Sequence, residues 1–382
     1  MNNVYVSGIG QVPVQENWDK SLKELAGDAA LLAIEDAHDG YPEALYVGNM
    51  MAGTANKQIQ LATMLADWLG MHHRSALAIE AACGSGAAAF RTAIMAVGSG
   101  EINSALVVGV EKMTDSPSAE ITASLATAAD AELESEFGIS FVALNALIMQ
   151  RYMYEYGWKT TDFAAFSINA HANGVHNPYA RFQKEITRAS FDNAGMICDP
   201  INLMDASPIG DGAAALLITS NPPNSAYPRV KVSASTAATD TISIQHRKKP
   251  TWLSAAEATA HEAYRQSGCT PDSIQVFEYH DAFSIMAALS LEACGFCEPG
   301  QGPRLANEGD IKLNGRIPVA TMGGLKARGH PVGATGAYQL VEVAQQLRGM
   351  AGRNQVEGAK VGMTQNIGGS GSNIITHILS LE

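Results

Sequence analysis

A cysteine set among glycines and alanines is the residue of this sequence best placed to do chemistry. Cys83 lies in the run 80–86, between an apolar, strand-like stretch at 76–79 and a small-residue helix predicted over 84–97. A thiol at the first turn of a helix faces the positive end of the helix dipole, which lowers its pKa. Small neighbours leave room for an acyl chain and let backbone N–H groups converge on an oxyanion. We interpret Cys83 as a nucleophile; the alternative is a buried structural cysteine.

Two histidines lie in loops that could hold a base next to this thiol. His330 stands between a glycine and a proline in the glycine-rich loop 323–336, ahead of a helix predicted over 335–347. A histidine held in one backbone geometry suits a general base. A phosphate-binding loop is the competing interpretation, but neither the P-loop spacing nor the dinucleotide pattern is present. His280 follows a strand predicted over 274–279, where a lone histidine is usually part of the core.

The elements that must position these residues alternate between strand and helix. Short β-branched runs and helical stretches follow one another before residue 111 and again after residue 212. This is the pattern of an α/β fold with a mostly parallel sheet. Residues 112–205 break the pattern, because they are more polar and contain helices predicted near 141–156 and 162–175. We interpret them as an inserted region, which is where ligand contacts often lie.

The two parts of the chain resemble each other. Segment 79–83 matches 277–281, each at a strand-to-helix junction, and 210–213 matches 369–372, each ahead of an apolar strand. The shared order indicates a duplicated α/β unit, in which His280 would lie opposite the cysteine.

Two prolines mark the boundary between the copies. Pro222 and Pro223 cannot continue a central strand and suit a linker. We therefore expect an N-terminal half at 1–221, which contains the insertion at 112–205, and a C-terminal half at 222–382.

Composition argues against several classes of protein. The 382 residues carry a formal net charge of −13, which disfavours a nucleic-acid binder, because such proteins neutralise phosphates with Lys and Arg. An apolar fraction of 46% with 16% charged residues indicates extensive burial in a core or in subunit interfaces. No apolar run approaches the roughly 20 residues that span a bilayer, and we find no secretory signal. We expect a cytoplasmic protein with no nucleic-acid or membrane partner.

The other cysteines give weaker signals. Five cysteines do not suggest a disulfide framework. Cys294 and Cys297 form a C-x-x-C pair at the end of a predicted helix, but a redox dithiol would favour a helix N-terminus and zinc would need two more ligands. We interpret the pair as structural thiols and expect no metal site. Cys198 and Cys269 have no supporting neighbours.

The motifs, taken in order, resemble those of the thiolase superfamily over essentially the whole chain. Cys83 in its small-residue setting is followed by Gly-Val-Glu-Lys-Met at 109–113, His-Asp-Ala-Phe at 280–283, Gly-His-Pro at 329–331 and Asn-Ile-Gly-Gly at 366–369. The chain is most similar to archaeal-type and sterol-carrier-protein-type thiolases. These carry His-Asp-x-Phe where ordinary thiolases carry Asn-Glu-Ala-Phe.

This resemblance implies a fold and a set of roles. The fold is a five-layered αβαβα arrangement of two similar halves, with an inserted loop domain that helps to bind coenzyme A. Cys83 would take the acyl group as a thioester, and His330 would help to activate it. His280 and His330 would form one oxyanion hole, for the thioester carbonyl of the enolate. The backbone N–H groups of Cys83 and Gly368 would form the second, for the acyl-enzyme.

One position departs from the biosynthetic thiolases. They carry a second cysteine in a C-terminal Cys-x-Gly motif, which moves a proton on the α-carbon of acetyl-CoA, and this chain has Asn366 there. Sterol-carrier-type enzymes place a cysteine in His-Asp-Cys-Phe, where this chain has Ala282. The base of a Claisen condensation must then be another group, such as His280 or His330. A Cys-His-His set without a second cysteine also resembles ketoacyl synthases, which form their carbanion by decarboxylation.

Coenzyme A carries several negative charges, so an acidic protein needs local positive charge to bind it. The densest basic run contains Arg247, Lys248 and Lys249, which we expect to meet the nucleotide phosphates; a solvated loop is the alternative. Phe283 of the His-Asp-Ala-Phe motif joins them as a predicted coenzyme A contact. Weaker candidates lie in the insertion: Arg181, Lys184 and Arg188 for the phosphates, and His171, His176 and Asn177 for the site.

The resemblance predicts an acetoacetyl-CoA thiolase, which interconverts two acetyl-CoA with acetoacetyl-CoA and free coenzyme A and holds no permanent cofactor. One alternative is a thiolase-fold acyltransferase or retro-aldolase that serves another acceptor with a partner subunit. Another is a silent scaffold, against which the presence of Cys83, His280 and His330 together speaks. A homodimer or tetramer is usual in the superfamily. Archaeal-type relatives work in a complex with hydroxymethylglutaryl-CoA synthase and a small zinc-ribbon/OB-fold protein.

Overall fold

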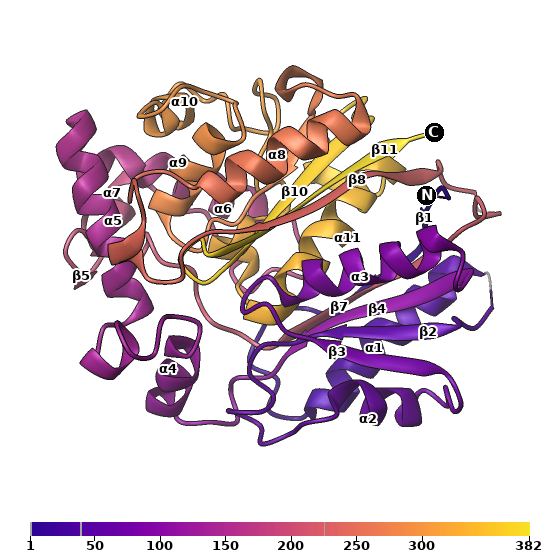
Figure 1. Ribbon diagram of the computed structural model, residues 1–382. Helices are drawn as coiled ribbons and strands as arrows, with labels where there is room; N and C mark the ends of the chain where they lie inside the picture. Colours follow the sequence, from indigo (N-terminus) through magenta and orange to yellow (C-terminus); the bar gives the residue numbers. More distant parts are fainter. Residues whose placement is uncertain (1, 39, 225) are drawn as a thin grey trace.

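Nine of the described strands form one mixed sheet in which two similar parts lie edge to edge. Five of its eight strand pairings are antiparallel, so the expectation of a mostly parallel sheet was wrong. The computed structural model describes residues 2–38, 40–224 and 226–382 (Figure 1). The strand order is β3-β2-β4-β7-β1 in the first part, continued by β8-β11-β10-β9 in the second. Two residue pairs between β1 and β8 join the parts: Tyr5 with Lys231, and Val6 with Val230.

The elements alternate as the sequence predicts. The first part contains β1 (Tyr5–Gln11), α1 (Leu22–Ala37), β2 (Ala44–Gly48), α2 (Leu61–Trp68), β3 (Ser75–Ile79), α3 (Ser85–Ser99), β4 (Ser104–Glu111) and β7 (Gly212–Thr219). The second part contains β8 (Val230–Thr239), α8 (Ser254–Ser267), β9 (Val276–Glu278), α9 (Ser284–Ala293), α10 (Gly302–Asn307), α11 (Thr335–Arg348), β10 (Val361–Gly368) and β11 (Asn373–Leu381). The predicted strands and helices thus correspond to observed ones, with ends that differ by a few residues.

Helices and strands lie in five layers (Figure 1), and apolar clusters pack between these layers. The first packs α1 and α2 against the outer face of the first-part strands, around Leu25 and Val108. The second encloses α3 and α11 between the two parts of the sheet, around Phe90 and Leu340. The third packs α8 and α9 on the outer face of the second-part strands, around Phe277. This order of helix, strand, helix, strand and helix confirms the five-layered αβαβα architecture.

The two central helices begin next to each other. An ideal Cβ on Gly86 in α3 would lie 2.9 Å from the backbone nitrogen of Ala337 in α11. One on Gly336 would lie 2.5 Å from the backbone nitrogen of Ala87. Glycine is therefore required at both positions, because a side chain at either one would push the helices apart. The loops that precede α3 and α11, and the residues they carry, meet at the centre of the molecule.

The strand order corrects one of the internal matches predicted from the sequence. Strands β2, β4 and β7 have the same neighbours in the first part as β9, β10 and β11 have in the second. The bridge between Phe277 and Val319 takes the place of β3. Segment 79–83, after β3, therefore corresponds to the stretch that leads into α11 and not to 277–281. That match was wrong by one strand–helix unit, because both segments follow an apolar strand and precede a helix, so their sequence patterns are similar.

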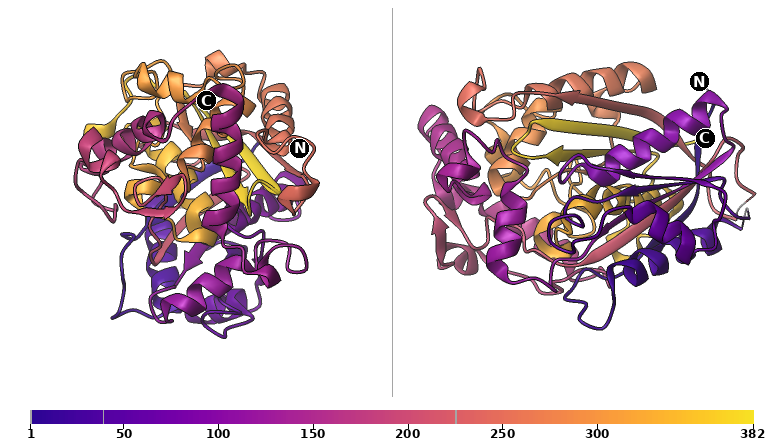
Figure 2. Two further views of the ribbon diagram at one scale, coloured as in Figure 1. Left: turned by 90° about the vertical axis from the view of Figure 1, so that its left-hand side faces the viewer. Right: turned by 60° about the horizontal axis from the view of Figure 1, so that its bottom comes forward.

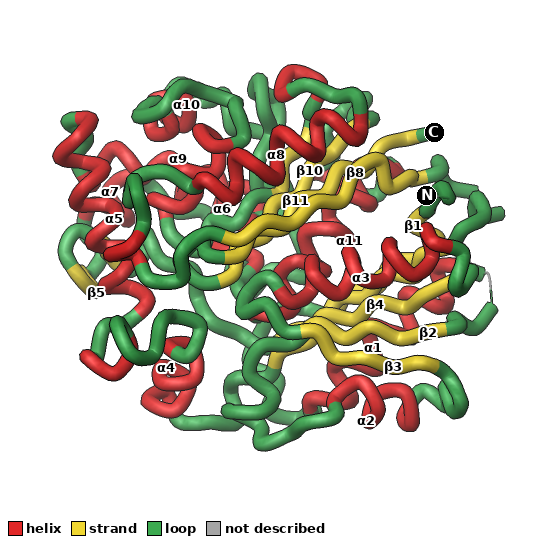
Figure 3. Tube along the Cα trace, viewed as in Figure 1, coloured by secondary structure: helices red, strands yellow, loops and turns green. Residues whose placement is uncertain are grey.

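The insertion covers the end of the molecule where α3 and α11 begin (Figure 2). It consists mainly of helix and loop, as Figure 3 shows. Its elements are α4 (Ser118–Ala126), α5 (Phe141–Tyr156), α6 (Ala164–Gly174), α7 (Arg188–Asp192), β5 (Met196–Cys198) and β6 (Ile201–Asn202). The backbone N–H groups of Arg181 and Phe182 donate to the carbonyls of Arg328 and Ala327. The insertion therefore rests on the loop that carries His330. The boundary at residue 222 stays a prediction.

Two observations concern the chain as a whole. All five cysteines are free thiols. Within the described residues, every helix is too short or too polar to cross a lipid bilayer.

Candidate active site

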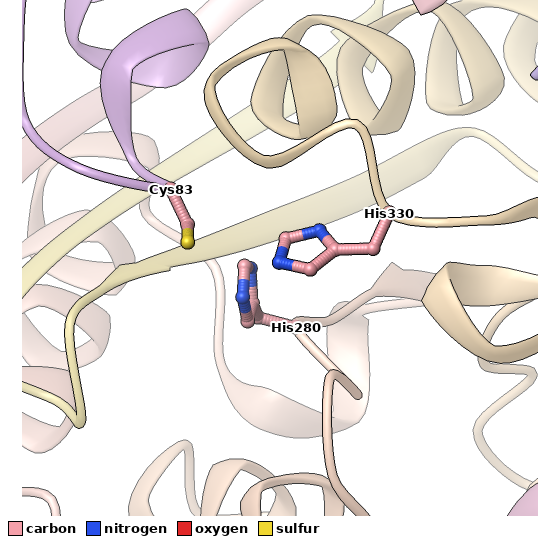
Figure 4. Close-up of side chains that lie close together, drawn as sticks. All are labelled: Cys83, His280 and His330. Carbon is pink, nitrogen blue, oxygen red and sulfur yellow. The ribbon is translucent and has the colours of Figure 1, made fainter. Parts of the chain in front are cut away.

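Cys83, His280 and His330 meet at one point, although they come from three separate segments (Figure 4). The sulfur and one ring nitrogen of each histidine lie within 4.8 Å of one another. The two imidazole rings stand edge to face, with their centroids 5.0 Å apart. His280 is 3% exposed and His330 is 7% exposed. The structure thus brings together the three residues that the sequence singled out.

A strained turn presents Cys83 at the end of β3. Ala82, the residue before it, has a φ of 50°, in the left-handed region that alanine rarely adopts. The turn is held by Gly84 N, which donates to the carbonyl of Ala81 over 2.9 Å. Ser85 Oγ accepts from Ala81 N and donates to the carbonyl of Ala82. Backbone strain of about 1–3 kcal/mol persists where the surroundings enforce it, as at sites that hold a reactive group.

The Cys83 thiol is protonated at rest, contrary to the sequence prediction. Burial raises its pKa to about 12, and the nearby carboxylate of Glu111 acts in the same direction. The helix end was expected to lower this pKa, but loss of water around the sulfur outweighs a dipole effect worth about 0.3–1 kcal/mol. Cys83 therefore needs a base to remove its proton during attack.

Asn366 fixes the proton position of His280. Its Nδ2 lies 2.9 Å from Nδ1 of the ring. An amide NH2 group only donates, so Nδ1 accepts and the ring proton lies on Nε2, the nitrogen left for the cavity. Burial, and then the charge of Arg328, lowers the pKa of His280 to about 3. His280 is therefore a neutral imidazole that offers an N–H donor, as an oxyanion hole requires.

His330 has a different partner and suits a different role. Its Nδ1 lies 2.7 Å from Thr335 Oγ1, in the first turn of α11. When Nδ1–H donates to this hydroxyl, Nε2 carries a free lone pair that can take the thiol proton. Burial, and then the neighbouring His280 and Arg328, lowers the pKa of His330 well below its usual range. The site therefore pairs a neutral thiol with two neutral imidazoles.

Buried polar contacts hold the His330 loop in place. Arg328 Nε lies 2.9 Å from the carboxylate of Glu342 on α11, and both side chains are fully buried. Arg328 Nη1 also donates to the carbonyl of Gly329. The backbone N–H of His330 donates to the carbonyl of Pro208. The loop is tied to α11 on one side and to the segment that follows the insertion on the other.

Glu111 joins the two parts of the molecule beneath the site. Its Oε2 accepts from the backbone N–H groups of Met50 and Gly333, and its Oε1 accepts from Met51 N and Asn49 Nδ2. Burial raises the pKa of Glu111 to about 7, although these four donors favour its charged form. An ideal Cβ on Gly333 would lie 2.6 Å from the carboxylate, so glycine is needed for this contact.

A cavity of about 150 Å³ opens over the three side chains. Its wall is mainly apolar and draws on the first part, the insertion and the second part, with Met50, Leu125, Phe141, Phe283 and Ile367 among its residues. The insertion thus supplies one wall of the cavity, as the sequence analysis expected. An apolar cavity with a few polar groups at its floor is the usual form of a small-molecule site.

The predicted coenzyme A contacts divide into two groups. Phe283 lines the cavity, and Lys248 and Lys249 are exposed. Arg247 points inward instead, because it is 5% exposed and its Nη2 donates to the carbonyl of Ser370 over 2.7 Å. It therefore braces the loop that follows β10, and its predicted contact with the nucleotide phosphates stays a prediction.

The loop that Arg247 braces carries the predicted oxyanion residue Gly368. An ideal Cβ on Gly368 would lie 2.5 Å from the carbonyl oxygen of Ala81. One on Gly84 would lie 3.6 Å from the nitrogen of Gly368. The backbone of Gly368 therefore lies directly against the Cys83 turn, and its role in an oxyanion hole stays a prediction.

The weaker candidates of the insertion lie outside the residues that line the cavity. Arg181 pairs with Glu16, and Arg188 pairs with Asp192. His171 is buried against Phe182 with Nδ1 at the carbonyl of Lys184. Asn177 donates to the carbonyl of Met322. These contacts hold the insertion and the neighbouring loop together.

Thr335 is the site residue that sequence reasoning missed. The signal that reveals it is the repeat, since Ser-Gly-Ala at 85–87 and Thr-Gly-Ala at 335–337 begin the two central helices. Ser85 shapes the Cys83 turn and Thr335 holds His330. The two hydroxyls occupy equivalent positions and each positions one reactive side chain.

Comparison with known proteins places the chain in a family. The family model described as "Thiolase, N-terminal domain" matches residues 9–222, and the one described as "Thiolase C-terminal domain-like" matches residues 236–381. The chain belongs to the thiolase family. This confirms the resemblance drawn from the motifs.

Individual relatives of this thiolase are similar over most of its length. The acetyl-CoA acetyltransferase of Methanothermobacter thermautotrophicus is 42% identical, with 100% of both chains covered. Sterol carrier protein 2 of Bos taurus is 31% identical over 98% of this chain and 72% of that protein. A solved structure titled "Ltp2-ChsH2(DUF35) aldolase" shares the fold, with a TM-score of 0.87 and 21% identity over 99% of this chain and 98% of that one.

Changing Asn366 tests how the proton of His280 is fixed. Asn366→Ala removes the donor to Nδ1, and we expect kcat of acyl transfer to fall about 10–100-fold with KM little changed. Asn366→Asp reverses the hydrogen bond, because a carboxylate only accepts, so the proton moves to Nδ1 and Nε2 no longer donates. We expect a larger loss from Asp than from Ala in steady-state kinetics. Asn314→Ala, at an exposed asparagine, is the control. An Asp variant as active as the original chain would contradict the assignment.

Proposed function

We propose that this thiolase is an acetoacetyl-CoA thiolase, which cleaves acetoacetyl-CoA with coenzyme A to give two acetyl-CoA and catalyses the reverse condensation. One observation carries the proposal: a neutral thiol meets a histidine that can accept its proton and a histidine that offers an N–H donor. The 42% identical acetyl-CoA acetyltransferase supports acetyl-CoA as the substrate. Coenzyme A thioesters are substrates in this proposal and not permanent cofactors.

Cleavage begins at Cys83. His330 Nε2 takes the thiol proton while the sulfur attacks the ketone carbon of acetoacetyl-CoA. The bond between the ketone carbon and the α-carbon then breaks, which leaves an acetyl thioester on Cys83 and the enolate of acetyl-CoA. The N–H of His280 and the protonated His330 stabilise the enolate oxygen, while the N–H groups of Cys83 and Gly368 hold the acyl oxygen.

The absence of a second cysteine gives His330 a further task. Asn366 occupies the predicted position of that cysteine, and its amide has no acid proton to transfer. In our proposal the proton taken from Cys83 goes from His330 to the α-carbon of the enolate, which releases acetyl-CoA. Free coenzyme A then attacks the acetyl-enzyme, and its thiol proton returns the site to its starting state. In the synthetic direction His330 removes the α-proton.

The acyl-enzyme gives the first test of this function. Mixing the protein with acetyl-CoA should add one acetyl group, which intact-mass spectrometry detects and peptide mapping places on Cys83. Cys83→Ala should abolish the adduct, whereas Cys269→Ala, at another half-buried free cysteine, should keep it. An adduct that survives Cys83→Ala would exclude the proposed nucleophile.

A thiolase-fold retro-aldolase that works with a partner is the second candidate. The fold is shared with the structure titled "Ltp2-ChsH2(DUF35) aldolase", and this likeness supports it. A complex with hydroxymethylglutaryl-CoA synthase and a zinc-ribbon/OB-fold protein stays part of our proposal for partners. The two functions differ in their product: coenzyme A-dependent cleavage of acetoacetyl-CoA by the isolated chain supports the thiolase, whereas acetylation of Cys83 without this cleavage favours the alternative.

Lys248 and Lys249 are our proposal for the phosphate contacts of coenzyme A. They follow Arg247, whose partner Ser370 adjoins the cavity residue Gly369. An exposed ion pair contributes about 0.2–1 kcal/mol, so the double change of both lysines to alanine should raise the KM for coenzyme A about fivefold at low salt and less at high salt. Changing Lys312 and Lys360, two exposed lysines outside the cavity wall, gives the same charge change as a control. Equal KM values in the two double variants would remove the proposal.

We propose a homo-oligomer that forms through the edge strand β3. Leu77 in this strand is 53% exposed, and β3 ends the sheet beside the Cys83 turn. Unprotected edges of this kind are usually covered in native proteins. Light scattering should give at least twice the mass of one chain, and Leu77→Lys should lower it. Leu147→Lys, at an equally exposed leucine on α5, should not. A monomeric unmodified chain would contradict the proposal.

We place the protein in the cytoplasm as a further proposal. Its five free cysteines support a reducing compartment, because such compartments keep thiols unpaired.

A further inference from the structure

We propose that Cys83, His280 and His330 also form a reversible binding site for Zn²⁺, in which the metal excludes the acyl group. This inference rests on the geometry of the three side chains and does not depend on the proposed reaction. A thiol and two imidazoles are the ligand types that zinc prefers, and three protein ligands with an open fourth position are the arrangement of accessible zinc sites. Among the described residues, this is the group of three such side chains whose ligand atoms converge.

The distances suit a metal after a small adjustment. The three ligand atoms lie within 4.8 Å of one another. Bonds of about 2.0–2.3 Å in tetrahedral geometry place ligand atoms roughly 3.5 Å apart. Each side chain must therefore move inward by no more than about 1 Å, which rotation about its own bonds can supply. The cavity above the three residues leaves the fourth position to water or to a small ligand.

Each histidine has a polar neighbour at Nδ1 that can orient its ring toward a metal. In metal sites the second ring nitrogen of a ligating histidine is usually held by a neighbouring polar group, which orients the ring. Here Thr335 holds Nδ1 of His330, so Nε2 of this ring is free for the metal. In His280 the ring proton must first move from Nε2 to Nδ1, and the amide of Asn366 must turn so that its Oδ1, which has no hydrogen-bond partner among the described residues, accepts that proton.

The charges around the sulfur also favour a cation. The carboxylate of Glu111 lies beneath the site, where it accepts from the backbone N–H of Met50, a residue that lines the same cavity as Cys83. The charge of Arg328, in the loop that carries His330, is paired with Glu342. Zn²⁺ would displace the thiol proton to solvent, so that a Zn–S bond forms as the S–H bond breaks. The bound thiolate and Glu111 together balance the charge of the metal.

Asn366 leaves the fourth coordination position of such a metal site without a protein ligand. A cysteine at that position would bring a second sulfur next to His280 and complete a set of two sulfurs and two nitrogens, which is the composition of closed structural zinc sites. An asparagine side chain offers no comparable ligand to zinc. The site therefore has three ligands, and we expect binding that a chelator reverses and that acetylation of Cys83 prevents, since the metal and the acyl group need the same sulfur.

Titration with Co²⁺ as a spectroscopic substitute for Zn²⁺ tests the site without any substrate. We expect one equivalent of Co²⁺ to produce a thiolate-to-cobalt charge-transfer band and the strong visible bands of four-coordinate cobalt, and Zn²⁺ to remove them by displacement. Cys83→Ser should abolish the charge-transfer band, and Thr335→Val should weaken binding about 10–100-fold. Cys269→Ser should leave the spectrum unchanged, since Cys269 lies outside the site.

Two results would overturn the inference. One is the lack of a charge-transfer band in the unmodified protein, and the other is a band that persists in Cys83→Ser. Pretreatment with acetyl-CoA gives an independent test. Protein acetylated on Cys83 should bind no Co²⁺. Equal Co²⁺ binding before and after acetylation would contradict the proposal that the metal and the acyl group use the same sulfur. The outcomes separate the two proposals: metal binding without acetoacetyl-CoA cleavage refutes the function alone, and cleavage without metal binding refutes the metal site alone.

Discussion

The contact between one protonated thiol and two neutral imidazoles is the interaction on which this structure depends. Burial produces it from both sides, since the same loss of water raises the pKa of Cys83 and lowers those of His280 and His330. The resting site therefore contains no thiolate–imidazolium ion pair, and charges form only when the proton leaves the Cys83 sulfur. The surrounding fold positions three neutral groups so that this movement takes place between atoms that lie within 4.8 Å of one another.

Glycine and buried hydrogen bonds provide this positioning. Gly86 and Gly336 let the first turns of α3 and α11 touch, which brings loops from the two parts of the molecule together. Glu111 then ties those loops beneath the site through four N–H donors. Because its hydrogen bonds are satisfied, this buried carboxylate can be tolerated, whereas removal of its partners would leave a costly unpaired charge. Packing and polar contacts thus act on the same loops.

The sequence predicts those features that local context determines. Cys83 after a strand and before a small-residue helix, and His330 between glycine and proline, are recognisable from their neighbours. His280 required the order of several motifs, because its immediate surroundings are those of a core histidine. The alternation of elements predicted an α/β fold, and only the resemblance implied its five layers.

Other features depend on contacts between distant segments and could not be predicted from the sequence. The pKa of Cys83 is raised because the insertion and the second part of the chain bury the sulfur, which its neighbours in the sequence do not reveal. Glu111, which also raises this pKa, lies 28 positions later in the sequence. Arg247 reads as part of an exposed basic run, yet it turns inward to Ser370, on a loop 123 positions later. In the sequence, Asn366 is notable only because biosynthetic thiolases have a cysteine at this position. In the structure its side chain donates to Nδ1 of His280 and so keeps the ring proton on Nε2.

Direct titration of the Cys83 thiol tests the central claim best. The ultraviolet absorbance of thiolate can be followed against pH as the difference between the unmodified protein and Cys83→Ser. Because burial raises the pKa of Cys83 to about 12, the group stays protonated below that pH, and the difference should show no thiolate between about pH 5 and 9. A midpoint at or below about 7.5, the range of thiols activated by a neighbouring charge, would show a stored thiolate and contradict this account.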